Sequence, residues 1–305
     1  MLCAGSHNAF GEGCKPRRPL PTITLKNMGP CAFSAETMSF DGEPKQQAMC
    51  LLRSADQTRN LGPTLENLPD EIASRAGLTT GLPTREVLST FLSEQNLEWD
   101  FAANLWRPMS RAHDNDPAAP TARYFVIHDT SGPNFRGREF PTDVDANPKI
   151  NNLSHFRCTD GWELAHAVVN RSGEMLLGHD FSIPWRATKF ERAKDFNGAL
   201  KGLFIHVELI QPRRHERRIG GSNDAQAPTP AFTPAQYDRL ALLYVIASVR
   251  AEQWLIPAFH VAIDAGIPGG HDDPLNFDIE AFAHSIHTVV DQVQKPERQQ
   301  AQQVP

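Results

Sequence analysis

Residues able to bind a metal ion stand in three separate segments of the chain. His128 closes the apolar run "RYFVIHD" (123–129), His260 lies within "IPAFHVAI", and Asp273 lies within "GGHDDPLNFD" (269–278). Two imidazoles and a carboxylate leave one position open on a tetrahedral zinc ion, the arrangement used to activate a bound water. No local spacing rule joins these segments. Taken alone, each histidine is more simply a hydrogen-bonded core residue, and the aspartate belongs to an acidic turn before a helix.

Further candidates stand near this set in the expected fold. In "FIHVEL" (204–209), His206 and Glu208 alternate with apolar residues, so one strand face carries an imidazole and a carboxylate. Facing a metal, Glu208 would be the general base for a bound water and His206 a substrate contact; a solvated sheet edge explains the alternation equally well. His271 can replace one of the ligands or stabilise an oxyanion.

The elements that must position these residues alternate between strands and helices. Strands are predicted over 123–129 and 202–211, and "WELAHAVVN" and "EMLLGHDF" flank the turn "RSG" as a hairpin. A long helix is predicted over 233–253, with Thr233 as its cap and Gln236 completing a capping box. A short strand in "IPAFHVAI" and a final helix in "FDIEAFAHSIHTVVDQV" follow. This order predicts an α/β fold, a mixed central β-sheet flanked by helices.

Composition shifts divide the chain into four expected parts. Residues 1–30 are rich in Cys, Gly and Pro without periodicity, and 31–110 show helical spacing typical of a small, mostly helical module. The polar, Pro-containing stretch 110–122 precedes the expected catalytic domain, 120–292. The polar tail, 293–305, is predicted to be disordered.

Charge and cysteine content limit the function classes. A chain of 305 residues with a net charge of −6 is large enough for an ample core but lacks the basic surface of a nucleic-acid binder. No apolar run is long enough to span a membrane, and no signal peptide is visible. The N-terminal cysteines predict two disulfides in an exported protein, with Cys158 left over; free thiols in a cytosolic protein are the alternative. The cysteines of the N-terminal group are Cys3, Cys14, Cys31 and Cys50.

From about residue 122 to 290 the chain resembles the zinc-dependent N-acetylmuramoyl-L-alanine amidases of the type 2 amidase and peptidoglycan recognition protein superfamily. Four stretches carry the resemblance in the family's order: "YFVIHDTSG", "LAHAVVNRSGEMLLG", "LFIHVELI", and the segment from "FTPAQYDRL" through "IPAFHVAI" to "GGHDDPLNF". The resemblance implies zinc ligands at His128, His260 and Asp273, and a catalytic glutamate at Glu208.

Three departures from the family pattern accompany this resemblance. The first strand ends in "HD" where many relatives have a second histidine, and the loop before Asp273 is lengthened by "AIDAGIPGG". His271 stands where relatives often carry a lysine. Either His271 does the electrostatic work of that lysine, the option we favour, or it replaces His260 as a ligand.

The resemblance implies hydrolysis of the amide between the lactyl group of N-acetylmuramic acid and L-alanine, in peptidoglycan or a soluble muropeptide. Glu208 would deprotonate the zinc-bound water and His271 would help to stabilise the oxyanion. Arg213 and Arg214 either pair with stem-peptide carboxylates or form a solvated basic loop. A periplasmic or extracellular enzyme is expected. A non-catalytic peptidoglycan-binding protein and an interbacterial toxin or lysin are the alternatives, and the oligomeric state is left open.

Overall fold

A five-stranded sheet forms the centre of the molecule in the computed structural model, which describes residues 31–55, 61–97, 104–157, 165–221 and 223–301. The strands are β3 (Tyr124–Asp129), β4 (Ala167–Val169), β5 (Met175–Leu177), β6 (Phe204–Leu209) and β7 (Ile256–Phe259), in the spatial order β5-β4-β6-β3-β7. Neighbouring strands are parallel except β5, which pairs with β4 as an antiparallel hairpin. The mixed sheet and the hairpin confirm the predicted α/β class.

The two central strands are buried on both faces. Every residue of β3 and of β6 is buried, as expected for parallel strands covered by helices on both sides. The alternation in "FIHVEL" therefore does not mark a solvated sheet edge. The register pairs His128 with Glu208, so these two side chains share one face at the carboxyl end of adjacent strands.

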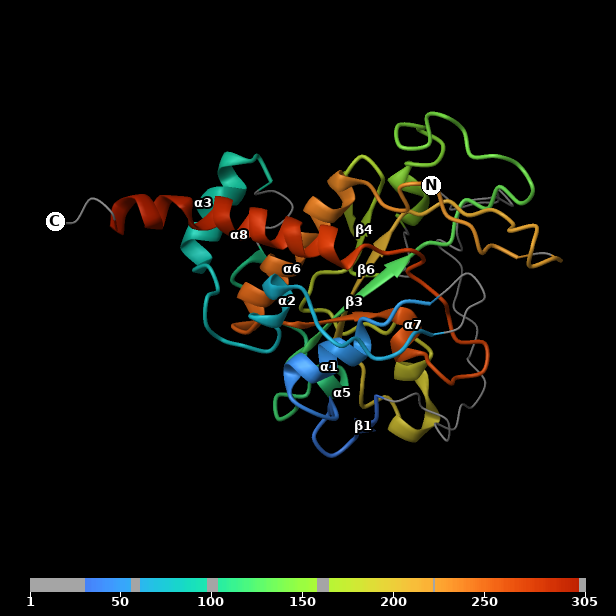
Figure 1. The fold of residues 1–305 in the computed structure, drawn as a ribbon. Coiled ribbons are helices and arrows are strands. Elements are labelled where there is room, and N and C mark those ends of the chain that lie inside the picture. The colour runs from blue at the N-terminus through green and yellow to red at the C-terminus, as the bar shows by residue number, and fades with distance from the viewer. Residues whose placement is uncertain (1–30, 56–60, 98–103, 158–164, 222, 302–305) are drawn as a thin grey trace.

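Helices cover the sheet and pack on one another (Figure 1). The helix α6 (Pro234–Ala251) begins at Thr233 with the predicted capping box, in which Gln236 donates its backbone N–H to the threonine hydroxyl. It packs against α8 (Ile279–Ala301). The shorter helical segments are α1 (Pro44–Leu51), α2 (Asp70–Ala73), α3 (Arg85–Glu94), α5 (Ala112–Asn115), η2 (Leu153–Phe156), η3 (Phe190–Arg192), η4 (Lys194–Phe196) and α7 (His260–Ile263).

The C-terminal segment corrects one expectation. The tail from residue 293 was predicted to be disordered, but α8 continues to Ala301. Lys, Glu, Arg and Gln, which fill most of this stretch, are good helix formers and extend an already nucleated helix at little cost, whereas Pro296 within it removes a backbone donor. Residues 302–305 lie outside the described part of the chain.

The segment expected to be a separate helical module shares the core of the sheet domain. Its helix α1 packs on β7, and α2 and α3 pack on α8, so one continuous hydrophobic cluster runs from Cys31 to Val293. A small hairpin is formed by β1 (Phe33–Ser34) and β2 (Ser39–Phe40). A disulfide links Cys31, just before this hairpin, to Cys50 in α1. This bridge bears out disulfide formation within the N-terminal group. The remaining cysteines and the expected coil over 1–30 lie outside the described residues.

The helices in the described ranges include none that is both long and apolar enough to cross a membrane.

The cap of α6 provides a stability test. Thr233→Ala removes the acceptor for the Gln236 N–H and the donor to the Arg171 carbonyl, both buried. We expect the free energy of unfolding in urea to fall by about 1–2 kcal/mol. The matched control is Thr288→Ala, because this exposed hydroxyl donates only to the His284 carbonyl of its own helix, and it should change little. Equal effects of the two substitutions would contradict the capping assignment.

Candidate metal centre

The carboxyl ends of the parallel strands bring the predicted ligands together. His128 is near the end of β3, and His260 follows β7 directly as the first residue of α7. Asp273 lies in the loop between α7 and α8, and its carbonyl accepts the Val261 N–H at 2.8 Å, which holds the loop against α7. One ligand atom from each of His128, His260 and Asp273 lies within 4.8 Å of the others, and all three residues are buried. This group can hold a metal ion.

Hydrogen bonds on the far side of one imidazole direct its lone pair into the centre. His260 Nε2 lies 3.1 Å from Oδ2 of Asp264, one helical turn later. Asp264 also accepts the Phe190 N–H, and although burial alone would raise its pKa, His260 and these hydrogen bonds lower it. A carboxylate only accepts, so the Nε2 atom of His260 carries the hydrogen and Nδ1 faces the centre.

The two ligand histidines approach each other closely. The Nδ1 atoms of His128 and His260 are 2.9 Å apart, and His260 Nδ1 is 3.2 Å from Oδ2 of Asp273. Two bare lone pairs repel at this distance, so a proton or a cation has to lie between them. The described residues therefore fit a metal ion, with two nitrogens and one oxygen as donors.

The pKa values show where that proton lies in the metal-free protein. Burial and the neighbouring His260 lower the pKa of His128 well below its usual value. Burial would also lower the pKa of His260, but Asp273 and Asp264 raise it well above the usual value. Burial would raise the pKa of Asp273, but His260 holds it well below. His260 is thus the favoured site for that proton, which a bound metal ion would replace.

Asp129 explains the departure "HD" at the end of the first strand. Its N–H donates to Oδ2 of Asp273 at 3.1 Å, while its carboxylate accepts from the Leu275 N–H and from Nη2 of Arg213 at 2.6 Å. Asp129 therefore holds both the side chain of Asp273 and the backbone two residues after it. Sequence reasoning missed this role, and the unusual dipeptide was its only signal.

Glu208 lies beside the ligands, and one of its carboxyl oxygens accepts no hydrogen bond from the described residues. Its Oε1 is 3.9 Å from Nδ1 of His128, and its buried Oε2 has no hydrogen-bond partner among the described residues. Burial and the charge of Asp273 raise the pKa of this carboxyl well above its usual value. A buried carboxyl oxygen without a partner is costly and rare, and it marks a place where a ligand or proton is handled.

His271 lies at the rim of the centre rather than among the ligand atoms. Its side chain is 56% exposed, its ring stacks on His260 with 4.6 Å between centroids, and its Nδ1 is 3.4 Å from Oδ1 of Asp273. The ligand group formed by His128, His260 and Asp273 does not require it. This position is open to solvent and suits a donor to a bound reactant.

The remaining predicted substrate contacts are placed differently. His206 and Arg213 are both fully buried, and their contact with substrate stays a prediction. The ring of His206 lies between His128 and Glu191, and the guanidinium of Arg213 donates a hydrogen bond to Asp129. Arg214 pairs with Glu139, and its guanidinium lies 5.3 Å from the centre of the Phe140 ring.

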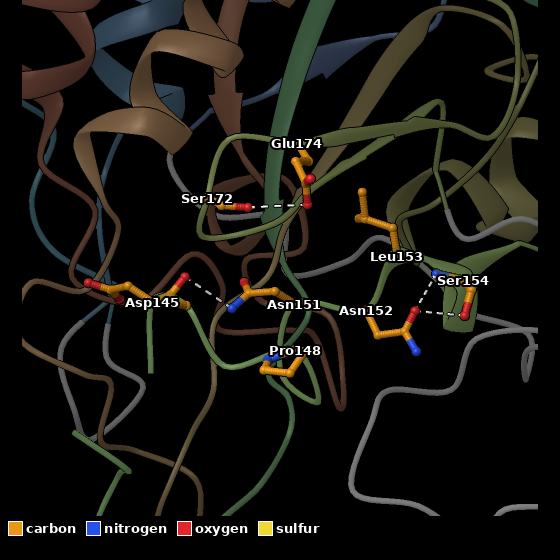
Figure 2. A pocket seen from close by; sticks show the side chains of 9 residues that line it. Asp145, Pro148, Asn151, Asn152, Leu153, Ser154, Ser172 and Glu174 are labelled. Atoms are coloured by element: carbon orange, nitrogen blue, oxygen red, sulfur yellow. Dashed lines mark hydrogen bonds between the residues drawn. The ribbon is translucent and has the colours of Figure 1, made fainter. Parts of the chain in front are cut away.

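A second concavity lies beyond the turn that follows β4 (Figure 2). This pocket of about 530 Å³ is lined by polar and apolar residues of the 145–154 loop and of the β4–β5 turn. Its polar groups bond to one another: Asn151 Nδ2 donates to backbone carbonyls, and Glu174 accepts from Ser172 and Asn170. We assign it no ligand.

No protein-family model, curated protein or solved structure matches the chain. The geometry of the site therefore carries the functional argument.

The ligand assignment predicts the outcome of single substitutions. His260→Ala removes a nitrogen that no other described side chain replaces, so stoichiometric zinc binding should be lost. His271→Ala should keep one zinc per chain, because His271 lies at the rim. Metal content after equilibrium dialysis distinguishes the two variants, and the reverse pattern would make His271 the ligand.

Metal binding should also release protons. The raised pKa of His260 leaves it protonated in the metal-free protein near neutral pH, and a metal must displace that proton. Zinc affinity should therefore rise with pH until the pKa of His260 is passed. Titrating zinc into weakly buffered protein with a pH indicator should show at least one proton released per ion; release of none would contradict the assignment.

Proposed function

We propose that the protein is a zinc-dependent amidase that hydrolyses the bond between the lactyl group of N-acetylmuramic acid and L-alanine in peptidoglycan or muropeptides. The observation that carries the proposal is the buried centre of His128, His260 and Asp273 with the unpartnered Oε2 of Glu208 beside it. This set combines a three-ligand metal site with a buried carboxyl group that has an unpartnered oxygen, as metal-assisted hydrolysis requires.

The residues would divide the chemistry as follows. Bound zinc would supply the Lewis acidity that makes water a nucleophile near neutral pH. A cation held beside Glu208 would favour its carboxylate form over the protonated form that burial and Asp273 favour. Glu208 then accepts the proton of the attacking water and returns it to the departing amine nitrogen, so the scissile C–N bond breaks as a neutral amine leaves. His271, at the exposed rim, donates a hydrogen bond to the oxyanion formed from the amide carbonyl.

An exported enzyme is consistent with this substrate. The Cys31–Cys50 disulfide is typical of proteins that fold in an oxidising compartment, which supports a periplasmic or extracellular location. A protein that only binds peptidoglycan has no need for a carboxyl group buried without a partner beside a complete ligand set. Glu208 therefore favours an enzyme over the binding protein.

The test is digestion of purified peptidoglycan. The zinc-loaded protein should release stem peptides with a free L-alanine amino group, and Glu208→Gln should lower kcat by on the order of 10²–10⁴-fold while retaining zinc. Glu86→Gln, an exposed residue of α3, is the matched control and should keep full activity. Cleavage at another bond would refute the proposed specificity, and an active Glu208→Gln variant would refute the assigned base.

A further inference from the structure

A line of buried hydrogen bonds runs from the metal centre into the protein behind it. Nε2 of His128 lies 3.0 Å from Nδ1 of His206, and Nε2 of His206 lies 3.2 Å from Oε1 of Glu191. All three side chains are buried, and His206 and Glu191 have no exposed surface. The hydrogens in such a line must all point the same way, because each imidazole nitrogen either donates or accepts.

The end of this line is fixed by three donors. Oε2 of Glu191 accepts from the Ala187 N–H at 3.1 Å, the Thr188 N–H at 3.0 Å and the Thr188 hydroxyl at 2.8 Å. An oxygen that accepts three hydrogens carries none itself. Nε2 of His206 lies 3.2 Å from each of the two Glu191 oxygens. Because Oε2 already accepts three hydrogens, the direction of the line is decided at the other oxygen, Oε1.

If Oε1 of Glu191 carries no hydrogen, the positions of the hydrogens on both imidazole rings are determined. His206 donates from Nε2 to Glu191, so its Nδ1 is an acceptor. His128 then donates from Nε2 to His206, so its own Nδ1 keeps a lone pair for the metal. In the opposite direction a hydrogen occupies Nδ1 of His128 and the ligand atom is blocked.

We propose that Glu191 and His206 are positioning residues that set the tautomer of His128 and thereby determine whether the centre can bind its metal. This inference rests on the proposed metal site but not on the proposed substrate. By linkage, a metal bound at His128 favours the charged form of Glu191 to the same extent that charged Glu191 favours the metal. Burial raises the pKa of Glu191 to about 8, against the effect of the Thr188 and Ala187 hydrogen bonds, so the charged form needs such support.

Two substitutions of Glu191 separate this role from a structural one. In Glu191→Gln the three donors hold the amide oxygen at the Oε2 position, so the amide NH₂ faces His206 and reverses the line. In Glu191→Ala nothing faces His206, which remains free to accept from His128. Zinc affinity should thus fall more in Glu191→Gln, by on the order of 10–100-fold, than in Glu191→Ala. Stability should fall more in Glu191→Ala, which loses the partner of three buried donors.

The measurement is zinc affinity by competition with a chromogenic chelator, at a pH above the pKa of Glu191, with urea unfolding of the same samples. Asp180→Asn is the matched control: this mostly buried carboxylate pairs with Arg250 outside the line and should leave zinc affinity unchanged. In the zinc-loaded wild-type protein, ¹⁵N shifts of the histidine rings should show His128 and His206 both protonated at Nε2.

The outcomes are distinguishable. If the wild-type protein binds no zinc, the proposed metal site and function fail. If it binds zinc but Glu191→Gln binds as tightly as the wild type, or more tightly than Glu191→Ala, the inference is overturned while the metal site stands. The ring ¹⁵N shifts decide the same question without any variant, because a hydrogen at Nδ1 of His206 in the zinc-loaded protein also overturns it.

Discussion

The Nδ1 atoms of His128 and His260 face each other 2.9 Å apart in a buried position, and the side chains around them depend on this contact. Each lone pair points inward only because a carboxylate stands behind its ring, Asp264 directly and Glu191 through His206. A buried arrangement of this kind is costly without a positive charge between the rings. The surrounding side chains therefore make sense together as the support of a cation site.

Two short segments supply most of that support. The helix η3 supports the rings of both His260 and His128. Its Phe190 N–H donates to Asp264, which holds His260, and its Glu191 accepts from His206, which holds His128. The end of β3 serves the loop, since Asp129 follows the ligand His128 directly and holds the segment around Asp273. Strand ends fixed by the central sheet thus determine the positions of ligands that come from separate parts of the chain.

The sequence predicted the positions of strands and helices better than the burial of their side chains. Strong periodicity and the Thr233 capping box located β3, β6 and α6, and ligand-type residues at the ends of apolar runs predicted the ligand group. Burial was misjudged, because alternation in "FIHVEL" cannot show that neighbouring strands and helices cover both faces. His206 was taken for a substrate-facing group for the same reason, and the burial of Arg213 was missed because no local pattern shows its pairing with Asp129. Glu191 was not found at all, because only tertiary packing brings it to His206.

This hidden part of the site bears on what the protein does. A histidine that merely fills a core needs its two nitrogens satisfied, and a hydrogen bond to a backbone carbonyl suffices, as for His166 with Ile183. His128 and His260 instead have one nitrogen satisfied from behind and the other directed at a shared point, with Asp273 facing the same point. Core packing alone gives no reason to leave Oε2 of Glu208 beside them without a partner. A metal ion at that point, with a proton exchanged at Glu208, would explain the arrangement, and this is the basis of the hydrolytic function that we propose.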